Sequence, residues 1–183
     1  MIRDAIAAER RELAEVLAEL SEDQWDTPSL CEGWRVREVV AHMTAPFRDP
    51  DARFLRGTTA DEINRAADEL ARADAARLTS AELTAALRDN ERHPWRPGSD
   101  VGALCHDVIH GLDITVALGL GRDVPPDRLR LVLDEIVPDR APFFGVDLTG
   151  KRLVATDLDW SSGDGEEVAR PARELVLVVC GRM

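Results

Sequence analysis

Residues 100–118 constrain the fold more than any other stretch, because apolar side chains cover nearly the whole circumference of a helix built from them. A helix with this pattern is buried, and polar side chains within it need partners. His106 and His110 are one turn apart, and Asp113 lies within about 20° of His106 on the same stripe. Without a partner, each buried group would cost roughly 1–3 kcal/mol. The stretch therefore predicts a buried helix that carries a polar site.

Two imidazoles one helical turn apart can chelate one metal ion, but the pair needs a third ligand from elsewhere in the chain. The sequence has only four histidines. His42 falls at the margin of an apolar stripe in a predicted helix, whereas His93 precedes a proline in a loop. We therefore predict that His42, His106 and His110 bind one divalent metal ion and that His93 is exposed. Zinc is favoured, although imidazole also suits nickel, copper and iron.

Asp113 is a candidate to hold the free ring N–H of His110 or His106, and a salt bridge on the helix surface is the alternative. Three neutral ligands leave the ion its full charge and an open position, which lowers the pKa of a bound water or thiol. Residues 106–110 also differ by one methylene from the His-Glu-x-x-His signature of zinc proteases. We disfavour that class, because Asp107 is shorter than the general base it requires and a helical chain offers no sheet edge to a peptide.

Composition narrows the class of protein further. A formal charge of −12, with arginines interleaved among acids, argues against nucleic-acid binding. No run of 18 apolar residues is present, and the first residues do not resemble a secretory signal. Cys31, Cys105 and Cys180 are odd in number and widely spaced, which predicts buried thiols in a reducing compartment. We expect a cytoplasmic protein, monomeric or homodimeric, that binds neither nucleic acid nor membranes.

Apolar periodicity and turn residues predict a mainly helical fold. The predicted helices cover about residues 4–20, 35–45, 60–76, 79–92, 100–118, 127–137 and 171–179. Pro46 is expected to end the second of these. Residues 151–157 and 166–170 are predicted strands, joined through the turn at residues 163–165. We therefore expect a metal-binding four-helix bundle over residues 1–125 and, over residues 126–183, a C-terminal helix and a small ββα appendage that pack on the bundle.

Three segments together resemble the DinB-like superfamily and, within it, the mycothiol-dependent maleylpyruvate isomerase-like family of actinobacteria. Residues 20–43 are similar to the helix-turn-helix that ends in that family's first histidine ligand. Residues 106–114 look like the family's ligand helix, and residues 153–160 with 181–182 are similar to its tail. Residues 47–99 match nothing that we can name.

The resemblance implies a bundle wound up-down-down-up, in which the three histidines hold zinc or another divalent ion. Its open face would receive a low-molecular-weight thiol such as mycothiol, with Asp157, Trp160 and Arg182 as candidate thiol-binding residues. True maleylpyruvate isomerases differ, because they place a glutamate where His106 stands and have a longer C-terminal domain. The resemblance therefore does not extend to activity on maleylpyruvate.

The leading functional hypothesis is a metal-dependent enzyme that activates mycothiol for transfer to, or isomerisation of, a small electrophilic substrate. The thiol should be external. Cys105 lies about 100° round the helix from His106, and Cys31 lies in a turn eleven residues before His42. A non-catalytic metal- or ligand-binding bundle and a metal-assisted hydrolase remain the alternatives. The sequence does not identify the electrophile.

Overall fold

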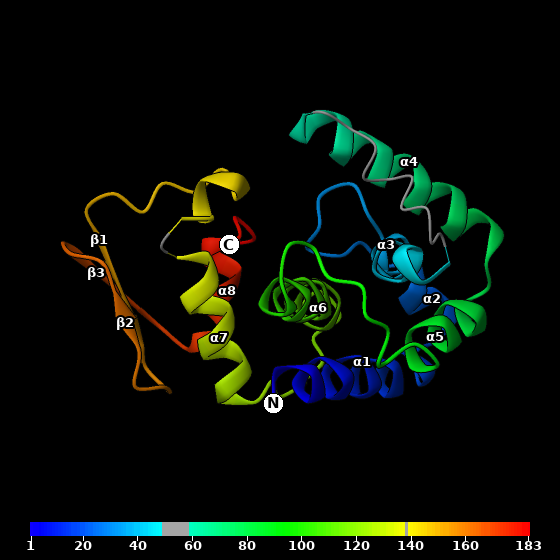
Figure 1. Cartoon of the computed structure of the whole chain (residues 1–183), viewed down its shortest axis with the longest axis horizontal. Helices are drawn as coiled ribbons and strands as arrows, with labels where there is room; N and C mark the ends of the chain where they lie inside the picture. Colours follow the sequence, from blue (N-terminus) through cyan, green and yellow to red (C-terminus); the bar gives the residue numbers. More distant parts are fainter. Residues whose placement is uncertain (49–58, 138) are drawn as a thin grey trace.

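The computed structural model describes residues 1–48, 59–137 and 139–183. Helices dominate it, and a small sheet follows near the C-terminus (Figure 1). The mainly α fold is thus confirmed. The helices are α1 (Ile2–Ala18), α2 (Glu22–Trp25), α3 (Val36–Arg48), α4 (Ala60–Arg77), α5 (Ser80–Arg88), α6 (Asp100–Thr115), α7 (Pro126–Ile136) and α8 (Ala172–Val179), with a 3-10 turn at Ala141–Phe144.

Four helices, α1, α3, α5 and α6, form a ring in which each contacts two others, and α4 packs against α3 outside the ring (Figure 1). Hydroxyl side chains begin several of these helices as the sequence suggests. Thr79 accepts a hydrogen bond from the amide of Glu82, whose side chain accepts from Thr79 in return, and Ser99 caps α6. The ring encloses one apolar core, built mainly from α1, α3 and α5 around Trp25 and Met43.

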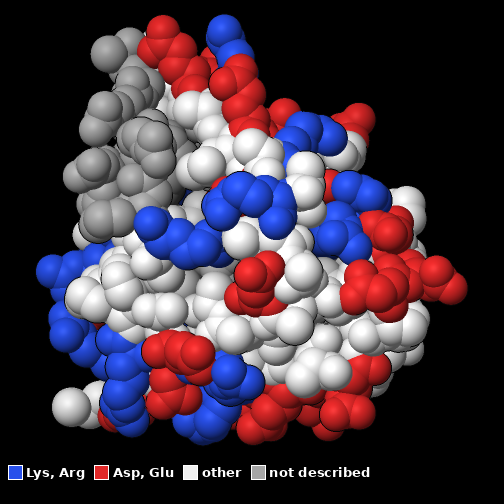
Figure 2. Space-filling model, turned by 90° about the vertical axis from the view of Figure 1, so that its right-hand side faces the viewer, with Lys and Arg blue, Asp and Glu red and all other residues white. Residues whose placement is uncertain are grey.

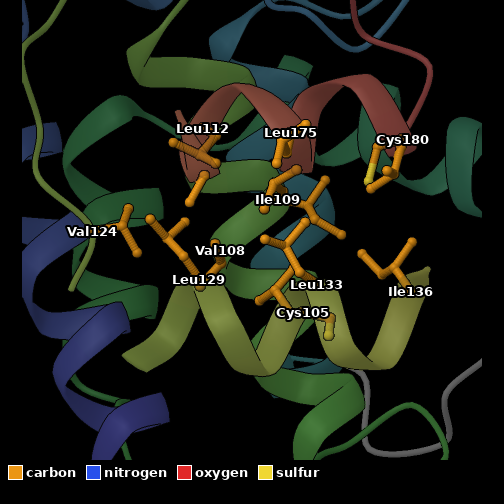
Figure 3. Packing of buried hydrophobic residues seen from close by; sticks show 14 of the residues in the cluster. Cys105, Val108, Ile109, Leu112, Val124, Leu129, Leu133, Ile136, Leu175 and Cys180 are labelled. Atoms are coloured by element: carbon orange, nitrogen blue, oxygen red, sulfur yellow. The ribbon is translucent and has the colours of Figure 1, made fainter. Parts of the chain in front are cut away.

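A second apolar core joins α6 to α7, α8 and the sheet, so α6 has apolar neighbours on both sides (Figure 3). This explains why residues 100–118 lack a polar face. The division into residues 1–125 and 126–183 stays a prediction. The labelled members of the second core are Cys105, Val108, Ile109, Leu112, Val124, Leu129, Leu133, Ile136, Leu175 and Cys180.

The C-terminal sheet differs from the predicted hairpin. It has three strands in the order β2-β1-β3: β1 (Lys151–Ala155) pairs antiparallel with β2 (Ser161–Ser162) and parallel with β3 (Glu166–Arg170). The two-residue β2 was missed because it is too short to show an alternating pattern. The prediction that the turn at residues 163–165 joins the two long strands in a hairpin is therefore wrong, and the appendage is βββα.

Two glycines allow the chain to pass from β2 on one side of β1 to β3 on the other side, close to the backbone at the start of β1. Gly163 and Gly165 have φ of 84° and 125°, in the region that favours glycine. A Cβ on Gly163 would lie 2.3 Å from the carbonyl oxygen of Lys151, and one on Gly165 would lie 2.2 Å from that of Gly150. This close backbone approach is what brings β3 alongside β1 in parallel register.

The sequence predicted that Pro46 ends this helix, and that prediction is wrong. Pro46 is buried within the last turn of α3. A proline has no amide hydrogen, so the carbonyl of His42, four residues earlier, loses its helical partner. Side chains supply other bonds here: the Thr44 hydroxyl donates to the carbonyl of Val40 (2.7 Å), and Arg48 donates to that hydroxyl. The helix continues past the proline to Arg48.

Charged side chains of both signs are interspersed on the face shown in Figure 2. None of the helices in the described part of the chain combines the length and the hydropathy that a membrane span requires. On this face, charges of both signs are mixed rather than gathered into a single patch of one sign.

Candidate metal centre

Three imidazoles converge between α3 and α6, as predicted from the sequence. The Nε2 atoms of His106 and His42 are 3.2 Å apart, and the His110 ring centroid lies 5.0 Å from that of His42 and 4.7 Å from that of His106. One ring nitrogen from each histidine can be chosen so that all three lie within 4.8 Å of one another. For comparison, two nitrogens 2.0–2.1 Å from a tetrahedral zinc ion lie roughly 3.3 Å apart.

The outward nitrogen of His106 is held by a carboxylate that sequence reasoning did not select. His106 Nδ1 lies 3.0 Å from Asp107 Oδ1, and Arg10 Nε donates to Asp107 Oδ2 at 2.7 Å. The side chains of Arg10 and Asp107 are 0% and 1% exposed. Two signals were present in the sequence: Asp107 is a charge within the apolar pattern of residues 100–118, and Arg10 is a charge between Ile6 and Leu13 on the face of α1 that is buried.

The outward nitrogen of His110 has a similar arrangement. His110 Nδ1 lies 3.1 Å from Asp113 Oδ2, and Arg182 Nε donates to Asp113 Oδ1 at 2.9 Å. Asp113 is fully buried. The structure thus places Asp113 on His110 rather than His106, and it makes Arg182 the partner of that carboxylate.

Burial lowers the pKa of His42 well below 6.5, and the two neighbouring histidines lower it further. Burial also lowers the pKa of His106, although its hydrogen bond to Asp107 opposes that effect. For Asp113, burial raises the pKa, but the hydrogen bonds from His110 and Arg182 outweigh it and the net shift is downward. His42 and His106 are therefore neutral at neutral pH, which is the form that binds metal ions.

Cys31 lies beside this site, contrary to what its distance from His42 in the sequence suggested. Its Sγ is within 4.8 Å of candidate ligand atoms of His110 and Asp113, and Arg182 Nη2 donates to it at 3.4 Å. Burial raises the pKa of the Cys31 thiol to about 11, and the charge of Asp113 adds to the effect. Cys31 is therefore a protonated thiol at neutral pH.

Asp157 and Trp160, which the resemblance suggested as thiol-binding residues together with Arg182, form hydrogen bonds elsewhere in the C-terminal part of the chain. Asp157 accepts a hydrogen bond from the backbone amide of Ala172 at the start of α8 (2.7 Å), and the indole of Trp160 donates to Asp134 (2.7 Å). Within the described part of the chain, Arg182 is the one of these three residues whose side chain reaches the surroundings of the histidines, through Asp113 and Cys31.

Aromatic rings flank the cluster. Trp34 packs on His42 with ring centroids 5.1 Å apart, and Trp95 packs on His106 at 5.0 Å. The expectation of an exposed His93 is wrong, because its ring is half-buried and packs 4.9 Å from that of Phe47. The loop that carries His93 also carries Trp95, which packs on His106 at the edge of the site.

Fold and site together define a class: a helical bundle with three histidines converging from two neighbouring helices. Residues 6–114 match the family described as mycothiol maleylpyruvate isomerase N-terminal domain. The chain therefore belongs to this family, as the sequence resemblance implied. Because the family is named for a domain of an isomerase, the expectation of an enzyme is confirmed at the level of the family.

Two solved structures share the fold of the whole chain. One is a mycothiol-dependent maleylpyruvate isomerase (15% identity, TM-score 0.57), and the other is its H52A mutant (13% identity, TM-score 0.58). In both cases the alignment covers 100% of this chain and 88% of the other. At this identity the likeness establishes the fold, appendage included. No curated protein matches the sequence.

Proposed function

We propose that the protein is a divalent-metal-dependent enzyme that activates a low-molecular-weight thiol, mycothiol, for transfer to or isomerisation of a small electrophile. The observation that carries the proposal is the convergence of His42, His106 and His110, with a 3.2 Å separation of two Nε2 atoms. This spacing fits two ligands of one tetrahedral zinc ion. An ion held by three neutral imidazoles would supply a Lewis acid with an open position, at which a thiol is deprotonated.

The residues around the histidines suit this role. Asp107 lies 3.0 Å from Nδ1 of His106, and Asp113 lies 3.1 Å from Nδ1 of His110. By accepting from a proton on Nδ1, these carboxylates would orient the rings and leave Nε2 as the ligand atom. Trp34 and Trp95 flank the cluster with apolar surface, which restricts water. Nickel fits the same donors, so zinc is the favoured ion rather than the necessary one.

The reactive thiol is external to the chain in this proposal. Burial raises the pKa of Cys31 to about 11 and that of Cys105 and Cys180 to about 12, so all three stay protonated at neutral pH. A protonated thiol is a poor nucleophile. A small thiol from a reducing cytoplasm, bound at the open position, avoids this restriction.

The test begins with the metal content of the purified protein, for which we expect one ion per chain. Metal-loaded protein is then mixed with mycothiol, glutathione or no thiol and with monobromobimane, and separately with maleylpyruvate. We expect mycothiol to raise the rate of conjugation or isomerisation in the wild type and not in His106→Ala.

Arg92→Ala is the control, because Arg92 is an exposed arginine that pairs with Asp4 at the surface and its loss should leave activity unchanged. If no thiol raises the rate above that of His106→Ala, the transfer hypothesis fails. Metal-dependent hydrolysis of an ester without any thiol would instead support the hydrolase alternative.

A further inference from the structure

A buried arginine from α1 reaches the metal centre through one carboxylate. Asp107 receives the Nε–H of Arg10 on Oδ2 (2.7 Å) and faces His106 Nδ1 with Oδ1 (3.0 Å). An ionised carboxylate only accepts hydrogen bonds, so Nδ1 of a neutral His106 must carry the proton. Its Nε2 then presents a lone pair toward Nε2 of His42.

Arg10 cannot easily turn away from this arrangement. Its Nη1 donates to three backbone carbonyls, those of Asn90 (3.4 Å), Glu91 (3.4 Å) and His93 (3.1 Å). Its Cζ lies over the ring of Phe47, 4.8 Å from the centroid, and its side chain is 0% exposed. The direction of its Nε–H is therefore fixed by the surrounding bundle.

We infer that Arg10 is a positioning residue that orients Asp107: it holds Oδ2 so that Oδ1 faces His106 Nδ1, and the carboxylate, which can only accept, keeps the proton on Nδ1 and leaves Nε2 unprotonated for a ligand. The tautomer itself does not depend on the proposed function, whereas its effect on metal binding rests on it. Metal-binding histidines commonly have such a partner on the other ring nitrogen. What is specific here is the distant arginine that controls the partner.

The substitution Asp107→Asn separates this role from a merely structural one. The asparagine amide has one oxygen and one NH₂ group, and Arg10 Nε–H can only be accepted by the oxygen. The NH₂ group must then face His106 Nδ1, which has to accept and shifts its proton to Nε2. We expect ¹⁵N NMR of the metal-free protein to show His106 protonated on Nδ1 in the wild type and on Nε2 in D107N.

Removing Arg10 in the D107N background should reverse the effect. Without the fixed donor, the amide is free to rotate, offer its oxygen to Nδ1 and restore the original tautomer. We therefore expect the Nδ1–H form in R10M/D107N. Should methionine prevent folding, R10Q/D107N serves instead, because a glutamine amide can present either a donor or an acceptor to the asparagine.

Metal affinity provides the second readout. Titration with Co²⁺ should show binding weakened about 10- to 100-fold in D107N and partly recovered in the double variant. Asp134→Asn is the matched control, since that carboxylate accepts from the Trp160 indole in the appendage and should leave Co²⁺ binding unchanged.

Two results would overturn the inference: an Nδ1–H tautomer in D107N, or an Nε2–H tautomer that persists when Arg10 is also replaced. If the tautomers behave as expected but no variant, wild type included, binds Co²⁺, the inference about Arg10 stands and the proposed metal-dependent function fails.

Discussion

The two histidines of α6 are supported by the same chemical groups, drawn from different parts of the molecule. Behind His106, Asp107 pairs with Arg10, which is 0% exposed and belongs to the first helix of the bundle. Behind His110, Asp113 pairs with Arg182, which follows the last helix and is 19% exposed. One support is therefore part of the bundle core, and the other is delivered by the C-terminal appendage.

This difference shows that the C-terminal appendage supports His110, through Arg182 and Asp113, whereas the support of His106 comes from the bundle. Arg10 is held by the loop carbonyls and by Phe47, so its carboxylate partner stays in place as long as the bundle is folded. Arg182 reaches Asp113 only when the chain after α8 is docked beside Cys31. Burial of Asp107 and Asp113 is nevertheless the same, which makes the two sides a natural internal comparison.

The largest expected effect tests whether His106 and His110, together with His42, bind the same metal ion. His42→Ala, His106→Ala and His110→Ala should each abolish stoichiometric metal, because two imidazoles alone hold an ion poorly. Elemental analysis after gel filtration measures this, with His93→Ala as the control that keeps its metal. Full retention in a His42→Ala/His106→Ala double variant would show that the ligands lie elsewhere.

The next effect concerns stability and should differ between the two sides. Arg10→Met leaves Asp107 buried without its cation, which should lower the free energy of unfolding by about 3–5 kcal/mol. Arg182→Met should cost less, about 1–3 kcal/mol, because the lost bonds are partly exposed and Cys31 and His110 remain beside Asp113. Urea unfolding of the metal-free variants measures both values.

Equal losses for the two arginines would contradict the distinction between a core support and a delivered one. Arg92→Met is the control, because Arg92 is an exposed arginine that pairs with Asp4 at the surface. Its substitution should change the free energy of unfolding by less than about 1 kcal/mol.

A smaller effect follows from pH. Burial is the main cause that lowers the pKa values of His42 and His106 in the folded protein below the ordinary value of 6.5. As the pH falls below 6.5, the unfolded chain therefore binds more protons than the folded protein does. The metal-free protein should therefore be most stable above about pH 7 and lose stability progressively as the pH falls below 6.5. Melting temperatures between pH 8 and 5 measure this, and a His42→Gln variant should show a shallower decline. A steeper decline in that variant would contradict the assignment.

The smallest expected effect is that of chelation on the fold. Both apolar cores are built from side chains that do not include the three histidines, so the helices should persist without an ion. A chelator should leave the helical circular-dichroism signal nearly unchanged at room temperature while lowering the melting temperature. Loss of that signal would show that the site is needed for folding.

The sequence was sufficient for the parts of the site that lie within one helix. The unbroken apolar pattern of residues 100–118 predicted burial, and burial made the spacing of His106, His110 and Asp113 meaningful. His42 could be added because it lies at the edge of an apolar stripe in α3. Local periodicity carried all of this information.

The remaining parts depend on contacts between distant segments. The Arg10–Asp107 pair joins residues 97 positions apart, and no periodicity in either segment indicates the other. Cys31 was placed away from the site because distance along the chain was used in place of distance in space. The parallel pairing of β1 and β3 was missed for the same reason, since it depends on the backbone approach at Gly163 and Gly165.

The proline in the last turn of α3 sets His42 apart from the other two proposed ligands. His106 and His110 lie within the continuous helix α6, whereas the carbonyl of His42 has lost the amide that a residue other than Pro46 would supply. The backbone at His42 therefore has one helical hydrogen bond fewer than the backbone at His106 or His110 would have within an uninterrupted helix. Zinc prefers four tetrahedral ligands, and other divalent ions prefer different geometries and bond lengths. In the proposed metal centre, adjustment to ions of different size would then fall to His42, while α6 holds the other two imidazoles at a fixed span.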